Sequence, residues 1–251
     1  MGIPKFLKIP KVQLALLLLV IALAAFWRFP SIDIYFSMVT AIGLTVFFDL
    51  AFTWLRKRQL FIPLAAIVTG LIISLTVSPQ AAWYQIAAIC ALAMSSKNFI
   101  KVRGRHVFNP AATGLFLGGL IFNLPVSWWG TSAPVFLLWL PALISALRMR
   151  RLPSILSFLA VYSLGLSRIA GSAPMSLLTV LTDPTIVFFA LVMLPEPMTS
   201  PSAPRRQAVY GGLVAIVSLL LTTLRIANFL PDILLPSLLL GNLSAGSFLR
   251  Y

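Results

Sequence analysis

Glu196 stands between two prolines, in the sequence PEPMTSP of residues 195–201. Proline lacks a backbone N–H and disfavours helix in the residue before it, so this carboxylate sits on extended backbone at the end of a hydrophobic segment. Such backbone persists near a membrane only where protein buries it or where it lines a cavity. Glu196 is therefore a candidate ligand-binding residue, and Thr199 and Ser200 of the same segment are included with it as candidate cofactor-binding residues. The alternative for Glu196 is a purely structural helix stop.

A second candidate site is centred on Asn109-Pro110, which has the pattern of a helix N-cap followed by proline at the first helical position. The short segment before it is basic and contains Lys97, Asn98 and Arg105. A helix N-terminus surrounded by bases attracts anions or electron-rich rings such as a reduced flavin. Lys97, Asn98, Arg105 and Asn109 are candidate cofactor-binding residues; ordinary capping beside cytoplasmic charge is the alternative.

These residues are carried by a chain that is 60% hydrophobic and only 10% charged, with a mean hydropathy of +1.00. A soluble domain carries about 25% charged residues, and a membrane span needs about 20 apolar ones. The hydrophobic pattern predicts an all-α integral membrane protein of about ten spans. The expected spans are 12–27, 32–55, 60–76, 81–96, 110–124, 131–148, 152–167, 176–195, 207–224 and 229–247.

The charge is sorted along these spans. The chain has 19 Lys and Arg against 5 Asp and Glu, a net charge of +14. With a cytoplasmic N-terminus, every basic residue except Arg28, Arg168 and Arg225 falls in a cytoplasmic loop or terminus. This predicts a multi-pass protein of the cell membrane with both termini cytoplasmic. A net charge of +14 would suggest a nucleic-acid partner in a soluble protein, but the mean hydropathy of +1.00 argues against one here.

An internal repeat relates the two halves of the chain. Ser78-Pro79 and Asp183-Pro184 each interrupt a hydrophobic stretch, about 100 residues apart, and each is followed by a helix and a basic loop. Because five spans are an odd number, tandem units at about 12–124 and 131–247 must insert with opposite topology. Binding sites of such inverted repeats lie where helices are interrupted.

Small residues occupy matching places in the two units. Thr69-Gly70 and Gly171-Ser172 put small side chains and accessible backbone toward the outer half of the membrane. We therefore add Thr69, Gly70, Gly171 and Ser172 to the candidate cofactor-binding residues.

Metal centres are not expected within the chain. Cys90 is the single cysteine and His106 the single histidine. One cysteine forms no intrachain disulfide, zinc site or thiolate-held iron–sulfur cluster, and one histidine forms no bis-histidine haem site. No catalytic residue is assigned, so enzyme activity stays open.

Several sequences in the chain resemble one family of membrane proteins. They are TGL at 69–71, SP at 78–79, KNFIKVRGRHVFNPAATGL at 97–115 and PEPMTSP at 195–201. The chain is similar over about residues 35–245 to the RnfD protein of the Rnf complex and the NqrB protein of the Na⁺-translocating NADH:quinone oxidoreductase. The resemblance implies ten helices in two inverted five-helix repeats. It also implies a bound flavin and electron transfer across the membrane, coupled with partner subunits to Na⁺ or H⁺ movement.

The chain departs from this family at the flavin attachment point. Family members bind FMN covalently through a threonine in the motif Ser-Gly-Ala-Thr, whereas residues 170–173 here read AGSA and Ala173 stands at the acceptor position. Alanine cannot form the phosphoester. The family's Asp-Pro element is also replaced, by Glu196-Pro197. Any flavin, riboflavin or FMN, is therefore expected to bind non-covalently near the cytoplasmic loops.

Two functional hypotheses remain open. The first is a membrane subunit of an ion-translocating oxidoreductase, working with other membrane subunits in the lipid bilayer. Backbone dipoles and bases would then stabilise the reduced flavin. The second is a carrier that keeps the inverted-repeat scaffold, has lost redox function and moves a small, flavin-like molecule. A purely structural assembly subunit is a third option. Fold similarity alone does not separate them.

Overall fold

The computed structural model describes residues 10–59, 61–132, 143–144, 146–169, 177–224 and 229–246. Its α-helices are α1 (Pro10–Arg28), α2 (Ile32–Lys57), α3 (Leu64–Thr76), α4 (Trp83–Phe99), α5 (Pro110–Phe122), α7 (Leu152–Ile169), α8 (Leu177–Thr182), α9 (Pro184–Phe188), α10 (Pro204–Thr223) and α11 (Leu234–Ser244). A π-helical turn (Phe189–Met193) continues α9, η2 (Trp129–Ser132) is a 3₁₀ turn, and β1 (Lys101–Val102) pairs with β2 (Arg105–His106).

These elements form an all-α membrane protein. Three described helices, α2, α7 and α10, are long and apolar enough to cross a membrane, and the shorter helices α3, α5 and α11 are also apolar. The helix bounds fall close to the expected spans. The expected span 131–148 lies largely outside the described residues.

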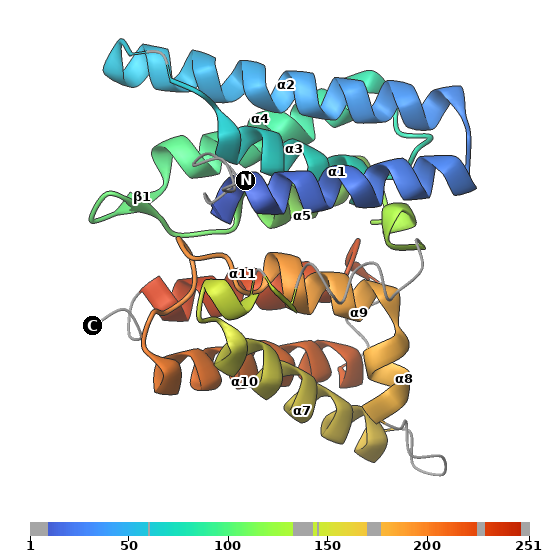
Figure 1. Ribbon diagram of the computed structural model, residues 1–251, viewed down its shortest axis with the longest axis vertical. Coiled ribbons are helices and arrows are strands. Elements are labelled where there is room, and N and C mark those ends of the chain that lie inside the picture. The colour runs from blue at the N-terminus through green and yellow to red at the C-terminus, as the bar shows by residue number, and fades with distance from the viewer. Residues whose placement is uncertain are drawn as a thin grey trace, which may run out of the picture.

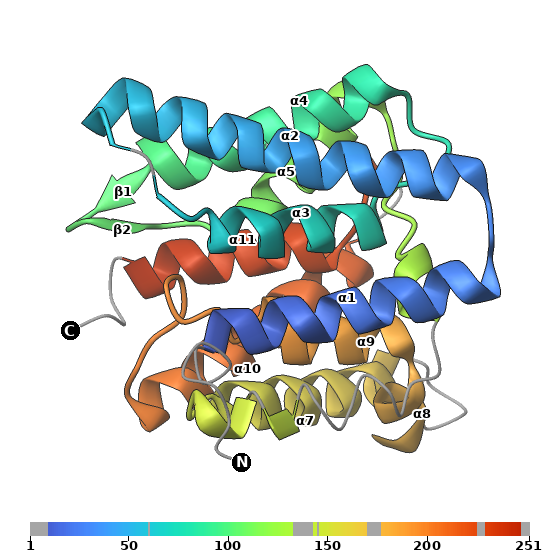
Figure 2. The ribbon, with the colours of Figure 1, turned by 45° about the horizontal axis from the view of Figure 1, so that its top comes forward.

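The described helices form two layers that meet along their length. Helices α1–α5 make the first half and α7–α11 the second half, with the helix axes running in roughly the same direction (Figure 1). The turned view shows α11 reaching across toward the first half (Figure 2), where it packs against α5. Within the halves, α2 packs on α3 and α4, and α10 packs along α7.

The expected break in the segment 176–195 is present at Asp183-Pro184. Asp183 Oδ1 accepts hydrogen bonds from the backbone N–H groups of Thr185 (2.8 Å) and Ile186 (3.0 Å). Pro184 takes the first position of α9, where a missing N–H costs nothing. The carboxylate is therefore an N-cap that ends α8 and starts α9.

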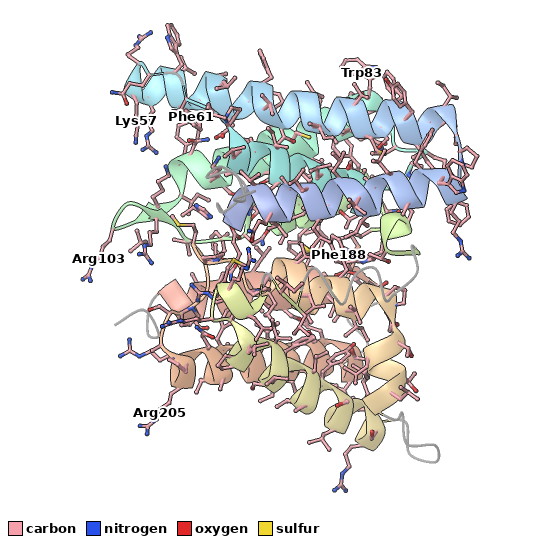
Figure 3. The ribbon with its side chains drawn as sticks, in the orientation of Figure 1. Lys57, Phe61, Trp83, Arg103, Phe188 and Arg205 are labelled. Atoms are coloured by element: carbon pink, nitrogen blue, oxygen red, sulfur yellow. The ribbon has the colours of Figure 1, made fainter. Side chains whose placement is uncertain are left out.

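Tryptophan side chains join the two halves at the end opposite the basic loops. Trp129 Nε1 donates to the carbonyl of Ser74 in α3 (2.8 Å), and Trp128 Nε1 donates to Asp232 Oδ2 just before α11 (2.9 Å). Phe188 packs edge-on against Trp128 and lies where the halves meet (Figure 3). These contacts fix α3 relative to α9 and α11.

Basic side chains gather at one end of the helices. Lys57 at the end of α2, Arg103 in the β1–β2 turn and Arg205 at the start of α10 all point outward there (Figure 3). Arg103 (φ 50°) and Gly104 (φ 79°) make the tight turn of this hairpin. Burial lowers the pKa of Lys101; the positive charges of Arg56, Lys57 and Lys97 lower it further, and the Asp49 carboxylate opposes them.

Replacing Gly211 by alanine is expected to separate α7 from α10. A Cβ at Gly211 would lie 2.1 Å from the backbone oxygen of Ser154, and backbone cannot give way as a flexible side chain can. Overpacking of this kind costs about 1–3 kcal/mol, which thermal unfolding in mild detergent would measure. Gly43→Ala in α2 is the control, since nothing lies within 4 Å of that Cβ. Equal unfolding midpoints for the two variants would contradict the close packing.

Candidate functional site

A cavity of about 460 Å³ lies between the two halves, near the basic end of the helices. Its walls are apolar and come from α1, α3, α5 and the π-helical turn after α9: Leu14, Ala65, Val68, Ile72, Pro110, Ala111, Leu191 and Val192. Met149 and the loop Pro195–Met198 close one side. Its polar lining residues are Thr69, Lys97, His106, Asn109 and Glu196. We call this space the inter-half cavity.

Glu196 reaches this cavity because the loop around it is tightly turned. Its backbone carbonyl accepts hydrogen bonds from the Ser200 N–H (3.0 Å) and hydroxyl (2.7 Å). Its Oε2 accepts from Thr199 Oγ1 (3.3 Å), and its Oε1 lies 3.1 Å from His106 Nε2. Thr199 and Ser200 are buried and do not line the cavity. They hold the turn that presents the carboxylate.

Arg151 supports this loop from behind. It is only 8% exposed and donates to the Pro201 carbonyl, to Ser200 Oγ (3.2 Å) and to the Pro197 carbonyl (3.5 Å). Burial lowers the pKa of this guanidinium; nearby Tyr210 opposes that effect and Arg105 adds to it. In the sequence, Arg151 was interpreted only as one of the positive charges that set the orientation in the membrane. Its position directly before α7 gave no sign of a partner 46 to 50 residues away.

Asn109 acts as the expected N-cap and also connects the two halves. Its Oδ1 accepts from the Ala112 N–H (3.0 Å), which caps α5. Its Nδ2 donates to the Met193 carbonyl in the π-helical turn (3.3 Å), and its own N–H donates to Asn242 Oδ1 in α11 (2.9 Å). Asn242 in turn donates to the Tyr210 hydroxyl (2.7 Å). The N-terminal end of α5 is thus hydrogen-bonded to the π-helical turn after α9 and to α11.

Lys97 and Asn98 are bound to a buried carboxylate in α2. Lys97 Nζ lies 2.6 Å from Asp49 Oδ2, and Asn98 Nδ2 donates to Asp49 Oδ1 (3.0 Å). Thr53 donates to Asn98 Oδ1 (3.2 Å), and Arg56 donates to the Asn98 carbonyl. Lys97 lines the cavity, whereas Asn98 does not. Local pairing therefore accounts for Asp49 and for the Asn98 side chain.

The other candidate residues lie in different places. Thr69 lines the cavity and donates to the Ala65 carbonyl (2.9 Å). Gly70 faces α2 instead, where an added Cβ would lie 2.8 Å from Ile42 Cα. Arg105 is exposed on β2 and does not line the cavity. Gly171, Ser172 and Ala173 lie outside the described residues. Cofactor binding by any of these residues stays a prediction.

The cavity lining fits an uncharged planar molecule with one hydrogen-bonding edge. Its volume lies within the range of about 300–1,000 Å³ typical of ligand pockets, and its walls are apolar with a few polar groups at one end. Among the described lining residues, Lys97 and His106 can carry positive charge, and each lies within 3.1 Å of a carboxylate. A phosphate would find no uncompensated cation there and would face Glu196. An uncharged apolar ring therefore matches this lining better than a phosphate group does.

The fold and the cavity together define an integral membrane protein built around a ligand-sized site between two layers of helices. The sequence model of the NQR2, RnfD, RnfE family matches residues 8–134. The chain belongs to this family of Rnf and Nqr membrane subunits, as its sequence motifs predicted. The match contains α1–α5 and Asn109 and ends before Glu196. No curated protein matches the chain.

Proposed function

We propose that this chain is the flavin-binding membrane subunit of an Rnf/Nqr-type electron-transport system. It holds riboflavin, or another flavin without a phosphate, non-covalently in the inter-half cavity. It takes part there in electron transfer across the membrane, coupled to ion transport with other membrane subunits. The observation that carries this proposal is the apolar cavity whose polar groups gather at one end, between the two halves.

The chain's own residues bind and orient the ring. Val68 and Ile72 of α3 and Leu191 of the π-helical turn line the cavity. Their apolar side chains contact the faces of the ring and exclude water from it. The polar end supplies hydrogen-bonding partners for the ring edge through Lys97, His106 and Glu196. A flavin supplies reversible two-electron chemistry when bound. π-Helical turns often occur at functional sites, which agrees with the one lining this cavity.

The proposed topology is two inverted five-helix repeats with both termini cytoplasmic. It is supported by the break at Asp183-Pro184 and by the short α3, which ends at Thr76 just before Ser78-Pro79. Lys57, Arg103 and Arg205 at one end of the helices mark that end as cytoplasmic by the positive-inside rule (Figure 3). The inter-half cavity then opens near the cytoplasmic face.

Riboflavin binding to the detergent-purified protein tests the proposal. We expect riboflavin fluorescence to be quenched on binding, and all bound flavin to be released by acid precipitation. Val68→Trp fills the cavity and is expected to weaken binding at least about tenfold, or about 1.4 kcal/mol. Val209→Trp, on an exposed part of α10, is the control and should bind as the wild type does.

Two outcomes would contradict the proposal. Flavin that stays with the acid precipitate would show covalent attachment despite Ala173. Riboflavin that fails to bind, or that binds Val68→Trp as well as the wild type, would exclude the inter-half cavity as its site. The carrier alternative remains a hypothesis, and uptake of labelled riboflavin into liposomes that contain this chain alone tests it.

A further inference from the structure

His106 and Glu196 meet at the polar end of the inter-half cavity from opposite halves of the molecule. His106 lies on β2 of the first half, and Glu196 lies in the loop after the π-helical turn of the second half. His106 Nε2 is 3.1 Å from Glu196 Oε1, and the side chains are 10% and 24% exposed. Both residues line the cavity. Two groups that can each bind a proton are therefore held together beside the ligand space.

The other charged groups around this pair are already engaged. From α4, Lys97 is paired with Asp49 of α2, which is fully buried. From the turn before α7, Arg151 donates to backbone carbonyls and to Ser200. Arg105 precedes His106 on β2 and is exposed. The second oxygen of Glu196 accepts from the neutral Thr199 hydroxyl. Among the described lining residues, Lys97 is thus held by a buried carboxylate, whereas the His106–Glu196 contact joins two groups that can each bind a proton.

We propose that His106 and Glu196 form a proton-binding site, which takes up one proton when negative charge develops on a flavin bound in the inter-half cavity. This inference rests on the proposed flavin site. Reduction by two electrons from an electrode, which itself supplies no protons, adds two electrons and one proton from solution to the ring and would leave one negative charge on it. The pair binds a second proton from the cytoplasmic solution, with an N–H bond formed on His106 or an O–H bond on Glu196. The added proton belongs to the pair as a whole.

The physical reason is the cost of an uncompensated charge away from water. A negative ring between apolar walls is poorly solvated, and a nearby group of opposite charge lowers that cost. Uptake of one proton raises the total charge of the pair by one unit, which offsets the negative charge on the ring. The exposed β1–β2 turn next to His106 gives the proton a short route from the cytoplasmic side. Charge is therefore balanced within the cavity.

The test is the pH dependence of the reduction midpoint potential of bound riboflavin, from about pH 7 to 8.5. If two protons are taken up with two electrons, the equilibrium constant of flavin reduction changes a hundredfold per pH unit. The midpoint potential then shifts by about 59 mV per pH unit. The double variant His106→Gln/Glu196→Gln keeps hydrogen-bonding side chains and removes both proton sites. It should show a tenfold change per pH unit, or 29.6 mV. Asp183→Asn is the control, because this carboxylate lies outside the cavity and asparagine also caps a helix. This variant is expected to show the wild-type slope of midpoint potential against pH.

A second measurement keeps the inference testable if the double variant does not fold. When the flavin is reduced at an electrode in weakly buffered solution, a pH-indicator dye reports how many protons the wild type takes up per flavin reduced, and we expect two. One proton per flavin in the wild type, or equal slopes for wild type and double variant, overturns the proton site and leaves the flavin site standing. A wild-type potential that depends on Na⁺ instead of pH also overturns it. Failure of riboflavin to bind overturns the flavin site and this inference together.

Discussion

Replacing Asp49 by asparagine is expected to destabilise the protein by about 3–5 kcal/mol, because it leaves the Lys97 ammonium without its counter-charge. Lys97→Met is expected to cost a similar amount, since it leaves a fully buried carboxylate unpaired. The double variant Asp49→Asn/Lys97→Met carries no charge at this place. It should therefore be no less stable than either single variant, although two independent losses would add.

Unfolding in mild detergent titrated with a denaturing detergent would measure this cycle. Lys57→Met is the matched control, because it removes an exposed charge at the end of the same helix and should change stability by less than about 1 kcal/mol. Additive effects of Asp49→Asn and Lys97→Met would refute a coupled pair. The contact would then be a minor feature of the α2–α4 interface.

Arg151→Met is expected to lower the free energy of unfolding by about 2–4 kcal/mol, the second large effect. The loss follows from the carbonyls of Pro197 and Pro201 and the Ser200 hydroxyl, which would lose a charged donor in a buried place. Because the same loop presents Glu196 to the inter-half cavity, riboflavin affinity should fall as well. Because Arg151 is only 8% exposed, its guanidinium interacts mainly with these hydrogen-bond partners and little with solvent.

The neighbouring Arg150→Met serves as the control for this prediction. Arg150 is exposed, carries the same charge and lies in the same short turn. Its replacement should leave the unfolding midpoint and the riboflavin affinity close to those of the wild type. If Arg150→Met and Arg151→Met behave alike, the buried bonds of Arg151 do not hold the loop.

Local patterns in the sequence predicted the helices of the described residues, and for two of them they also predicted where the helix starts. Asn109-Pro110 and Asp183-Pro184 start helices because capping and the missing proline N–H act within a few residues. The β1–β2 hairpin was not predicted, since it lies in a loop of basic residues without strand periodicity. The membership of the chain in the NQR2, RnfD, RnfE family also followed from short motifs.

The sequence also placed Thr69, Lys97, Asn109 and Glu196 among the site residues, and the fold brings these four to one cavity. It could not tell which of their neighbours face inward. Asn98, Thr199 and Ser200 carry suitable polar groups, but these groups form intramolecular hydrogen bonds. Polar type indicates what a side chain can bind, and the competition between partners is decided by packing.

By itself, then, the sequence determined the membrane-spanning segments, the sorted charge, the helix caps and the family. All of these depend on residues close together in the chain and on transfer of apolar side chains into lipid. Only the tertiary structure decided that Lys97 meets Asp49, 48 residues away, and that His106 meets Glu196, 90 residues away. Contacts at such separations form only when the elements pack together. A buried polar group without a hydrogen bond is costly, so each one pairs with a partner on the neighbouring element.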